Sequence, residues 1–139
     1  MKDISRFEAP HHKDFNKALQ EIRNGKKLTH WMWYIFPQLE ALGKSETAKF
    51  YGIEDRREAE AFLQHPLLGK NLITISEAML ALPGNNATAV LGQPDDMKLQ
   101  SCTTLFAQLK DAPPVFQQLL DKYYGGRPDG NTQTLLRSE

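Results

Sequence analysis

The chain has 139 residues, of which 40% are apolar and 24% are charged, as is usual for one globular domain. Its 17 Lys and Arg balance its 17 Asp and Glu, which argues against a protein that neutralises nucleic-acid phosphates or adheres to an anionic membrane. The single cysteine, Cys102, excludes an internal disulfide and a cysteine-rich zinc site. No apolar run approaches the ~20 residues of a membrane span. We therefore expect a single cytoplasmic domain over residues 1–139, with no nucleic-acid or membrane partner; the oligomeric state stays open.

Apolar residues follow helical rather than strand spacing from the beginning of the chain. Residues 1–12, which include His11 and His12, lack the apolar core of a signal peptide, and we expect them to form a loosely ordered N-terminal segment. The apolar positions within residues 15–22 predict a first helix, which ends at the Asn-Gly pair of residues 24–25 because glycine readily adopts the left-handed conformation of a helix stop.

The rest of the chain predicts an all-α domain of six to seven helices with short loops. The clearest helix has five apolar residues spaced four, three, four and three apart between Leu68 and Leu82. Ser45 is a plausible cap for a preceding helix, and Asp55 with Glu58 has the spacing of a capping box. The further predicted helices and one-turn segments lie, in chain order, at residues 38–42, 48–51, 59–63, 68–82, 87–91, 95–109, 113–123 and 132–136.

The segment THWMWYIFPQL, residues 29–39, contains both tryptophans of the chain. Trp31, Trp33 and Phe36 either stack on a flat ligand or belong to the core. Their spacings of two and five residues spread them around a helix, so at least one ring leaves the packing face. His30 is either an acid–base group, because histidine titrates near neutrality, or a half-buried residue bonded to a backbone carbonyl. We expect one tryptophan to belong to the core and the other to line a cleft with His30 and Gln38.

The helix predicted after Pro94 supplies the opposite wall of this cleft. Asp95, Lys98 and Ser101 follow one another at intervals of three and share a polar stripe beside the apolar face that contains Cys102. An acid, an amine and a hydroxyl at the edge of a core suit the polar corner of a pocket. The alternative is a solvated ion pair and a helix cap. Cys102 itself is interpreted as buried and unreactive.

The loop YYGGRPDG, residues 123–130, is a third candidate, because a glycine pair lets backbone N–H groups approach an anion. It lacks the lysine and the following helix of a phosphate-binding loop, so it favours a helix stop and a turn. No pair of histidines or carboxylates has metal-ligand spacing. We therefore expect no metal and no cofactor.

Four parts of the sequence together resemble a known family. HWMWYIFPQL at residues 30–39, AKFYGI with EAEAFLQHPLLG at residues 48–69, PDDMKLQSCTTLF at residues 94–106 and YYGGRPD at residues 123–129 are similar to the bacterial domain of unknown function 1810. The resemblance covers nearly the whole chain and implies a small all-helical fold without an assigned activity. The order of the motifs also resembles, more distantly, all-helical N-glycosidases that act on ribose-linked metabolites. That likeness implies a carboxylate, Asp95 or Asp96, and a tryptophan that stacks on the substrate.

Two functions of different classes follow. The leading hypothesis is a small-molecule site, for a nucleotide or a ribosylated metabolite, between the tryptophan segment and the helix after Pro94, with hydrolysis as the candidate reaction. The alternative is a non-catalytic protein-interaction module. The first hypothesis places His30 and Lys98 on one concave surface. Its candidate catalytic residues are Asp95, Asp96 and His30, and its candidate ligand-binding residues are Trp31, Trp33, Gln38, Lys98 and Ser101.

Overall fold

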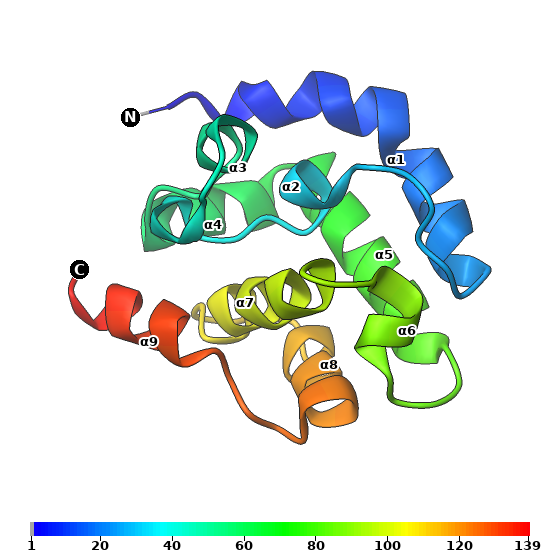
Figure 1. Cartoon of the computed structure of the whole chain (residues 1–139). Coiled ribbons are helices and arrows are strands. Elements are labelled where there is room, and N and C mark those ends of the chain that lie inside the picture. Colours follow the sequence, from blue (N-terminus) through cyan, green and yellow to red (C-terminus); the bar gives the residue numbers. More distant parts are fainter. Residues whose placement is uncertain (1) are drawn as a thin grey trace.

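Helices joined by short loops make up the computed structural model, which describes residues 2–139 (Figure 1). In that part of the chain there is no β-strand, and one isolated bridge pairs Leu39 with Ile53. The all-α prediction is confirmed, but the described residues form nine α-helices rather than six to seven, because several are only four or five residues long. The elements are η1 (Ile4–Phe7), α1 (Glu8–Arg23), α2 (Met32–Ile35), η2 (Glu40–Leu42), α3 (Glu46–Phe50), α4 (Arg56–Gln64), α5 (Leu68–Ala81), α6 (Ala87–Leu91), α7 (Asp95–Ala107), α8 (Val115–Tyr124) and α9 (Gly130–Arg137).

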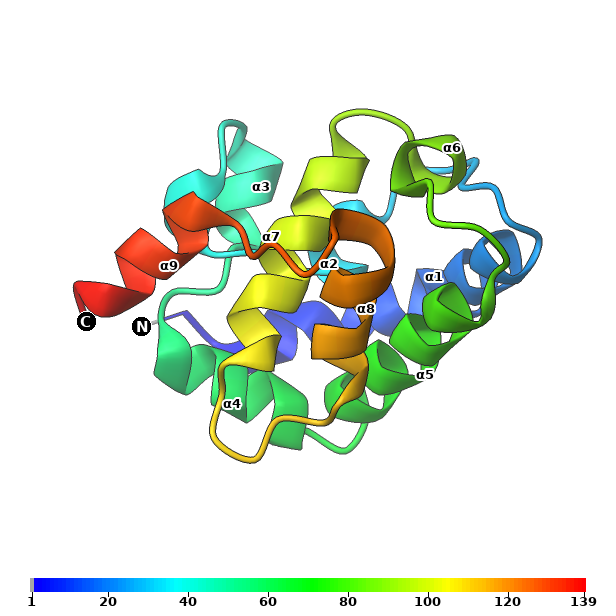
Figure 2. The same cartoon turned by 90° about the horizontal axis from the view of Figure 1, so that it is seen from below.

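Helix α5 crosses the middle of the fold and organises the core. It packs against α1 on one side and α8 on the other, and α7 lies along α8 (Figures 1 and 2). Leu72, Ile75 and Met79 of α5 are fully buried. The rings of Phe106 and Phe116 join α7 to α8, with their centroids 5.5 Å apart. The apolar stripe predicted between Leu68 and Leu82 therefore lies on α5, at the centre of one continuous apolar core.

The N-terminal segment differs from the expectation for residues 1–12. Residues 4–12 lie in η1 and α1, and Phe7 and His11 are buried; Met1 lies outside the described residues. Phe7 packs edge to face on Phe62 of α4, with ring centroids 4.9 Å apart. The sequence did not indicate that these residues are helical and packed, because the partners of Phe7 and His11 come from distant segments of the chain.

A buried ion pair connects η1 to the middle of the chain. Arg6 donates from its two terminal nitrogens to the Glu58 carboxylate at 2.8 and 2.9 Å, and both side chains are less than a tenth exposed. Arg6 also donates to the Gly52 carbonyl at 2.8 Å. Asp55 caps α4 by accepting from the Glu58 N–H, as the capping box predicts. The Glu58 side chain, however, accepts from the Glu54 N–H instead of that of Asp55.

Helix α7 carries the second half of the predicted cleft and places its apolar face as expected. Cys102, Leu105 and Phe106 are fully buried. Burial raises the pKa of the Cys102 thiol well above its ordinary value. Across residues 2–139 no helix is both long and apolar enough to cross a bilayer.

Candidate ligand-binding site

A single carboxylate fixes the loop that leads into the tryptophan segment. Glu21 of α1 accepts hydrogen bonds from the Leu28 N–H at 2.8 Å and from the N–H and hydroxyl of Thr29 at 3.0 and 2.6 Å. It also accepts from the indole N–H of Trp31 at 2.9 Å. Trp31 is fully buried. Its predicted role in ligand binding is therefore corrected: the indole belongs to the core, and its polar atom is bonded to Glu21.

Trp33 has a different environment from Trp31. It is half-buried, and the Lys98 ammonium lies 5.7 Å from the centroid of its ring, within reach of a cation–π interaction. Trp33 is therefore a cation–π partner of Lys98 and is not itself among the side chains that line the cleft described below.

Asp95 binds two lysines at the N-terminus of α7. Its carboxylate lies 2.9 Å from the Lys27 ammonium and 3.6 Å from that of Lys98. Lys27 comes from the loop after α1, and its side chain is only 7% exposed. Asp95 thus ties this loop to α7. The predicted polar stripe of Asp95, Lys98 and Ser101 exists, with Asp95 in a structural ion pair at one end.

Two predicted catalytic residues lie away from this stripe. His30 is exposed and does not line the cleft, because its neighbours Thr29 and Trp31 turn inward to Glu21. Asp96 accepts from the Thr88 hydroxyl at 2.5 Å and faces a separate hollow toward α6 and α8. The expectation that His30 and Lys98 share a concave surface is therefore not met.

The wall opposite α7 is formed by η2 and α3. The Ile53 N–H donates to the Gln38 carbonyl, and the Glu40 N–H donates to the Ile53 carbonyl, both at 2.8 Å. A Cβ at Gly52 would lie 2.3 Å from the Glu40 Cα, so this close approach requires glycine. Ser45 caps α3 by accepting from the Ala48 N–H at 3.1 Å, as predicted.

These elements enclose a cleft of about 520 Å³. Residues of α3, of the first half of α7 and of the start of α9 line the cleft; Figure 2 shows α9 beside α7. The cleft brings together the predicted residues Gln38, Lys98 and Ser101. The remaining lining residues are Leu42, Lys44, Ser45, Ala48, Pro94, Met97, Asp129 and Asn131.

Asp129 and Lys44 are functional candidates that the sequence analysis missed. Asp129 caps α9: one oxygen accepts from the N–H of Thr132 at 2.9 Å and from its hydroxyl at 2.6 Å. The N–H of Asp129 donates to the Thr104 hydroxyl of α7 at 2.8 Å, which holds the start of α9 beside that helix. The YYGGRPDG loop contains Asp129 and is the sequence signal that could have indicated it. Lys44 carries no local pattern that distinguishes it from any surface lysine.

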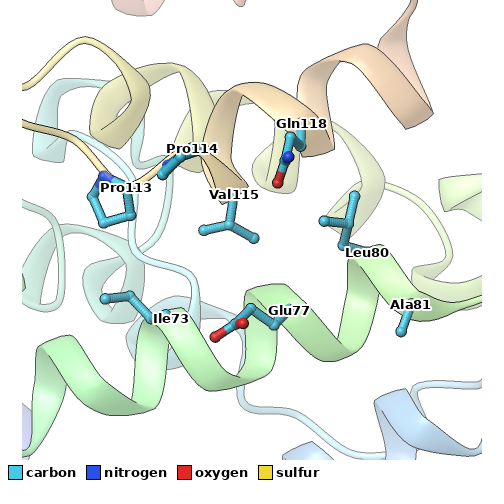
Figure 3. A pocket seen from close by; sticks show the side chains of 8 residues that line it. All are labelled: Ile73, Glu77, Leu80, Ala81, Pro113, Pro114, Val115 and Gln118. Carbon is cyan, nitrogen blue, oxygen red and sulfur yellow. The ribbon is translucent and has the colours of Figure 1, made fainter.

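A hollow between α5 and α8 has fewer polar side chains on its wall than the cleft. It has a volume of about 410 Å³ and is mainly apolar (Figure 3). Glu77 is the charged side chain on its wall, and Ile73, Leu80 and Val115 are among its apolar residues. Within residues 2–139 no group of three His, Cys, Asp or Glu side chains is placed to hold a metal ion.

The fold and the cleft define a small all-helical protein whose candidate site lies between η2–α3 and the N-terminal half of α7. Over residues 1–136 the chain matches a family described as protein of unknown function (DUF1810), and it belongs to that family. Its structure is similar to the 1.38 Å crystal structure of the conserved hypothetical protein Rv1873 from Mycobacterium tuberculosis. The two share 43% identity with a TM-score of 0.94, over 97% of this chain and 96% of that one. No curated protein matches the chain.

Proposed function

We propose that this protein binds a small metabolite in the cleft between η2–α3 and α7. The observation that carries the proposal is the meeting of Gln38, Lys98 and Ser101, from two distant segments, on the wall of one hollow of about 520 Å³. Ligand pockets usually measure about 300–1,000 Å³ and combine apolar walls with a few polar groups. The apolar side chains of Leu42, Ala48 and Met97 supply such a wall.

A nucleotide or a ribosylated metabolite is the proposed ligand class. Such a molecule combines an apolar face with hydroxyl groups and often an anionic group. The cleft offers amides from Gln38 and Asn131, hydroxyls from Ser45 and Ser101 and the Lys98 ammonium as their partners. Met97 is 66% exposed and belongs to the same wall, so it presents an apolar surface that a ligand would cover.

Hydrolysis remains the candidate reaction within this proposal. Breaking a bond to an anomeric carbon requires a carboxylate near the ligand. Asp129 is the carboxylate that lines the cleft, whereas Asp95 is bound to Lys27 and Asp96 faces another hollow. Asp129 is therefore the residue we would test first for a catalytic role.

The alternative function, a protein-interaction module, receives less support. Within residues 2–139 three large apolar side chains are prominently exposed, namely Leu28, Phe50 and Met97. They belong to the loop before α2, to α3 and to α7. Single exposed apolar residues are normal on monomeric proteins, whereas partner surfaces are contiguous patches.

A thermal-shift screen with nucleotides, nucleosides and ribose phosphates tests the proposal. A ligand at 100 times its dissociation constant stabilises the protein by about 2.7 kcal/mol, which raises the melting temperature by several degrees. Met97→Ala should weaken binding without lowering stability much, because the side chain is largely exposed. Lys110→Ala, an exposed change in the turn after α7 and away from the cleft, is the control and should leave binding unchanged. The absence of any shift, or equal loss in both variants, would contradict the proposal.

A further inference from the structure

A second hollow, separate from the cleft, lies where α6 and α8 meet the first turns of α7. Its volume is about 410 Å³, and Figure 2 shows α6 and α8 beside α7. Met97 lines both this hollow and the cleft, so the two adjoin, but their polar side chains are different. The hollow is lined by Asn85, Asn86, Ala87, Thr88, Asp96, Met97, Gln100, Tyr123 and Tyr124.

Asp96 connects the three helices around this hollow. One of its carboxylate oxygens accepts from the Thr88 hydroxyl of α6 at 2.5 Å, and the other accepts from the Met97 N–H at 2.9 Å. Its backbone carbonyl accepts from the Tyr124 hydroxyl of α8 at 2.5 Å. The polar wall is therefore ordered in the folded protein, which reduces the entropy that a ligand must remove on binding.

The amide side chains of the wall keep hydrogen-bonding groups for a ligand. The Asn86 carbonyl oxygen caps α6 by accepting from the Ala89 N–H at 3.0 Å, which leaves the Asn86 NH2 group as a donor. The Gln100 NH2 group donates to the Arg127 carbonyl at 2.9 Å, which leaves the Gln100 oxygen as an acceptor. Asn85 is exposed and offers both ends of its amide. The wall thus presents donors and acceptors together.

The acceptors of this wall belong to one face of α7. Asp96 and Gln100 are four residues apart on the helix, which places their Cβ atoms about 5–6 Å from each other. A carboxylate has about four acceptor positions, so Asp96 retains acceptor capacity beyond its two bonds within the protein. One small ligand can therefore contact both side chains.

The two tyrosines contribute ring surface. Tyr123 donates its hydroxyl to the Met79 carbonyl at 2.7 Å, and Tyr124 donates its own to the Asp96 carbonyl. The ring centroids lie 6.5 Å apart, and both side chains are half-buried. Because both hydroxyl protons are already used, the rings offer mainly apolar surface to a ligand.

The charge of the wall distinguishes between classes of ligand. Asp96 is the charged side chain among the lining residues, and the ion pairs formed within residues 2–139 do not include it. An anion would be repelled by this carboxylate. A cation would leave the NH2 groups of Asn85 and Asn86 without an acceptor. Hydroxyl groups both donate and accept, so several of them on one molecule can use every group of the wall.

We propose that the hollow between α6, α7 and α8 binds a neutral sugar. The hydroxyls of the sugar bond to Asp96, Gln100 and the two asparagines, and its apolar C–H groups contact the tyrosine rings. This site goes beyond the proposed function, because its polar side chains are not those of the cleft.

NMR titration of the ¹⁵N-labelled protein with glucose, galactose, xylose and maltose tests the proposal. At least one of these sugars should shift the side-chain NH2 signals of Asn85, Asn86 and Gln100 and the backbone signal of Thr88. Addition of NaCl should leave the affinity unchanged, because salt screens charges and a neutral ligand carries none.

Asn86→Asp replaces the free donor with an acceptor and should weaken sugar binding by about three- to tenfold. Aspartate caps helices as well as asparagine does, so α6 should persist. Asn16→Asp makes the same chemical change at an exposed position of α1, away from the hollow, and should leave binding unchanged. Equal weakening in both variants would overturn the proposal.

Three other results would also overturn it. The first is the absence of shifts with all four sugars at millimolar concentration. The second is binding of spermidine at Asp96 that weakens with salt while the sugars do not bind, which would identify a cation site. The third is a set of sugar-induced shifts confined to cleft residues such as Lys98 and Ser101, which would leave the proposed function standing. Sugar binding in the hollow without nucleotide binding in the cleft would support this inference and contradict the proposed function.

Discussion

Burial changes the acid–base behaviour of single side chains, and His11 is the clearest case. Its Nε2 lies 2.8 Å from the Tyr34 carbonyl oxygen, and its Nδ1 lies 3.0 Å from the Asn71 amide nitrogen. A carbonyl only accepts and an amide NH2 only donates, so these partners assign the proton to Nε2 and require a neutral ring. Burial lowers the pKa of His11 from 6.5 to about 4, although the Tyr34 carbonyl acts in the opposite direction.

Stability should therefore decrease in weak acid. Between pH 6.5 and about 4 the unfolded chain binds a proton at His11 that the folded protein does not. The free energy of unfolding then falls as the pH is lowered, by up to roughly 3 kcal/mol from this residue. Urea denaturation at several pH values measures the slope. His11→Gln, which keeps a side-chain donor, should reduce the slope, and the exposed His12→Ala should keep it. An unchanged slope in His11→Gln would contradict the assignment.

Between elements, Glu21 connects α1 to the loop before α2 and to the Trp31 indole. Burial by itself would raise the pKa of this carboxyl group, but the hydrogen bonds from Thr29, Leu28 and Trp31 lower it to about 2. The carboxylate is therefore ionised at all ordinary pH values. Its contribution to stability is complete above about pH 4.5 and is lost as the pH falls toward 2.

Glu21→Gln should lower the free energy of unfolding by roughly 2–4 kcal/mol, because it replaces hydrogen bonds to a charged acceptor and places an NH2 group among donors. Urea denaturation at pH 7 gives the magnitude, and Trp fluorescence reports the environment of the indole. Glu77→Gln, an exposed change on α5, is the matched control and should stay within about 0.5 kcal/mol. A Glu21→Gln protein as stable as this control would show that the loop is held by its other contacts.

The whole molecule has one apolar core that extends from α1 through α5 and α7 to α8. No helix of this set can bury its apolar face without the others. We therefore expect one cooperative unfolding transition, as is usual for a domain of this size. Cys102 lies in this core, fully buried on α7, so its reactivity reports on the fold as a whole.

Thiol labelling should depend on global unfolding. The raised pKa and the burial of Cys102 both predict negligible reaction with an aromatic disulfide reagent under native conditions. In increasing urea the labelled fraction should follow the loss of the far-UV circular dichroism signal. Labelling at a urea concentration where the helical signal is intact would reveal local opening of α7, and the single-core description would then be wrong.

The sequence predicted the long helices and several of their ends because these signals are local. The Leu68–Leu82 stripe became α5, and Ser45 and Asp55 cap the helices they precede, within three residues of the N–H groups they bind. Helix α2 had no such signal, because its four residues carry neither a periodic stripe nor a side-chain cap. Helix periodicity likewise placed Cys102 in the core.

By itself, then, the sequence determined the all-α class, most of the elements and the polar stripe of Lys98 and Ser101, all of which depend on residues a few positions apart. Only the tertiary structure decided that Trp31 is buried and bonded to Glu21, while the Trp33 ring lies within cation–π distance of Lys98. It also decided that Asp129 joins Lys98 in one cleft. The physical reason is that the environment of a side chain depends on partners that folding brings from distant segments, and their positions are not encoded in any local pattern.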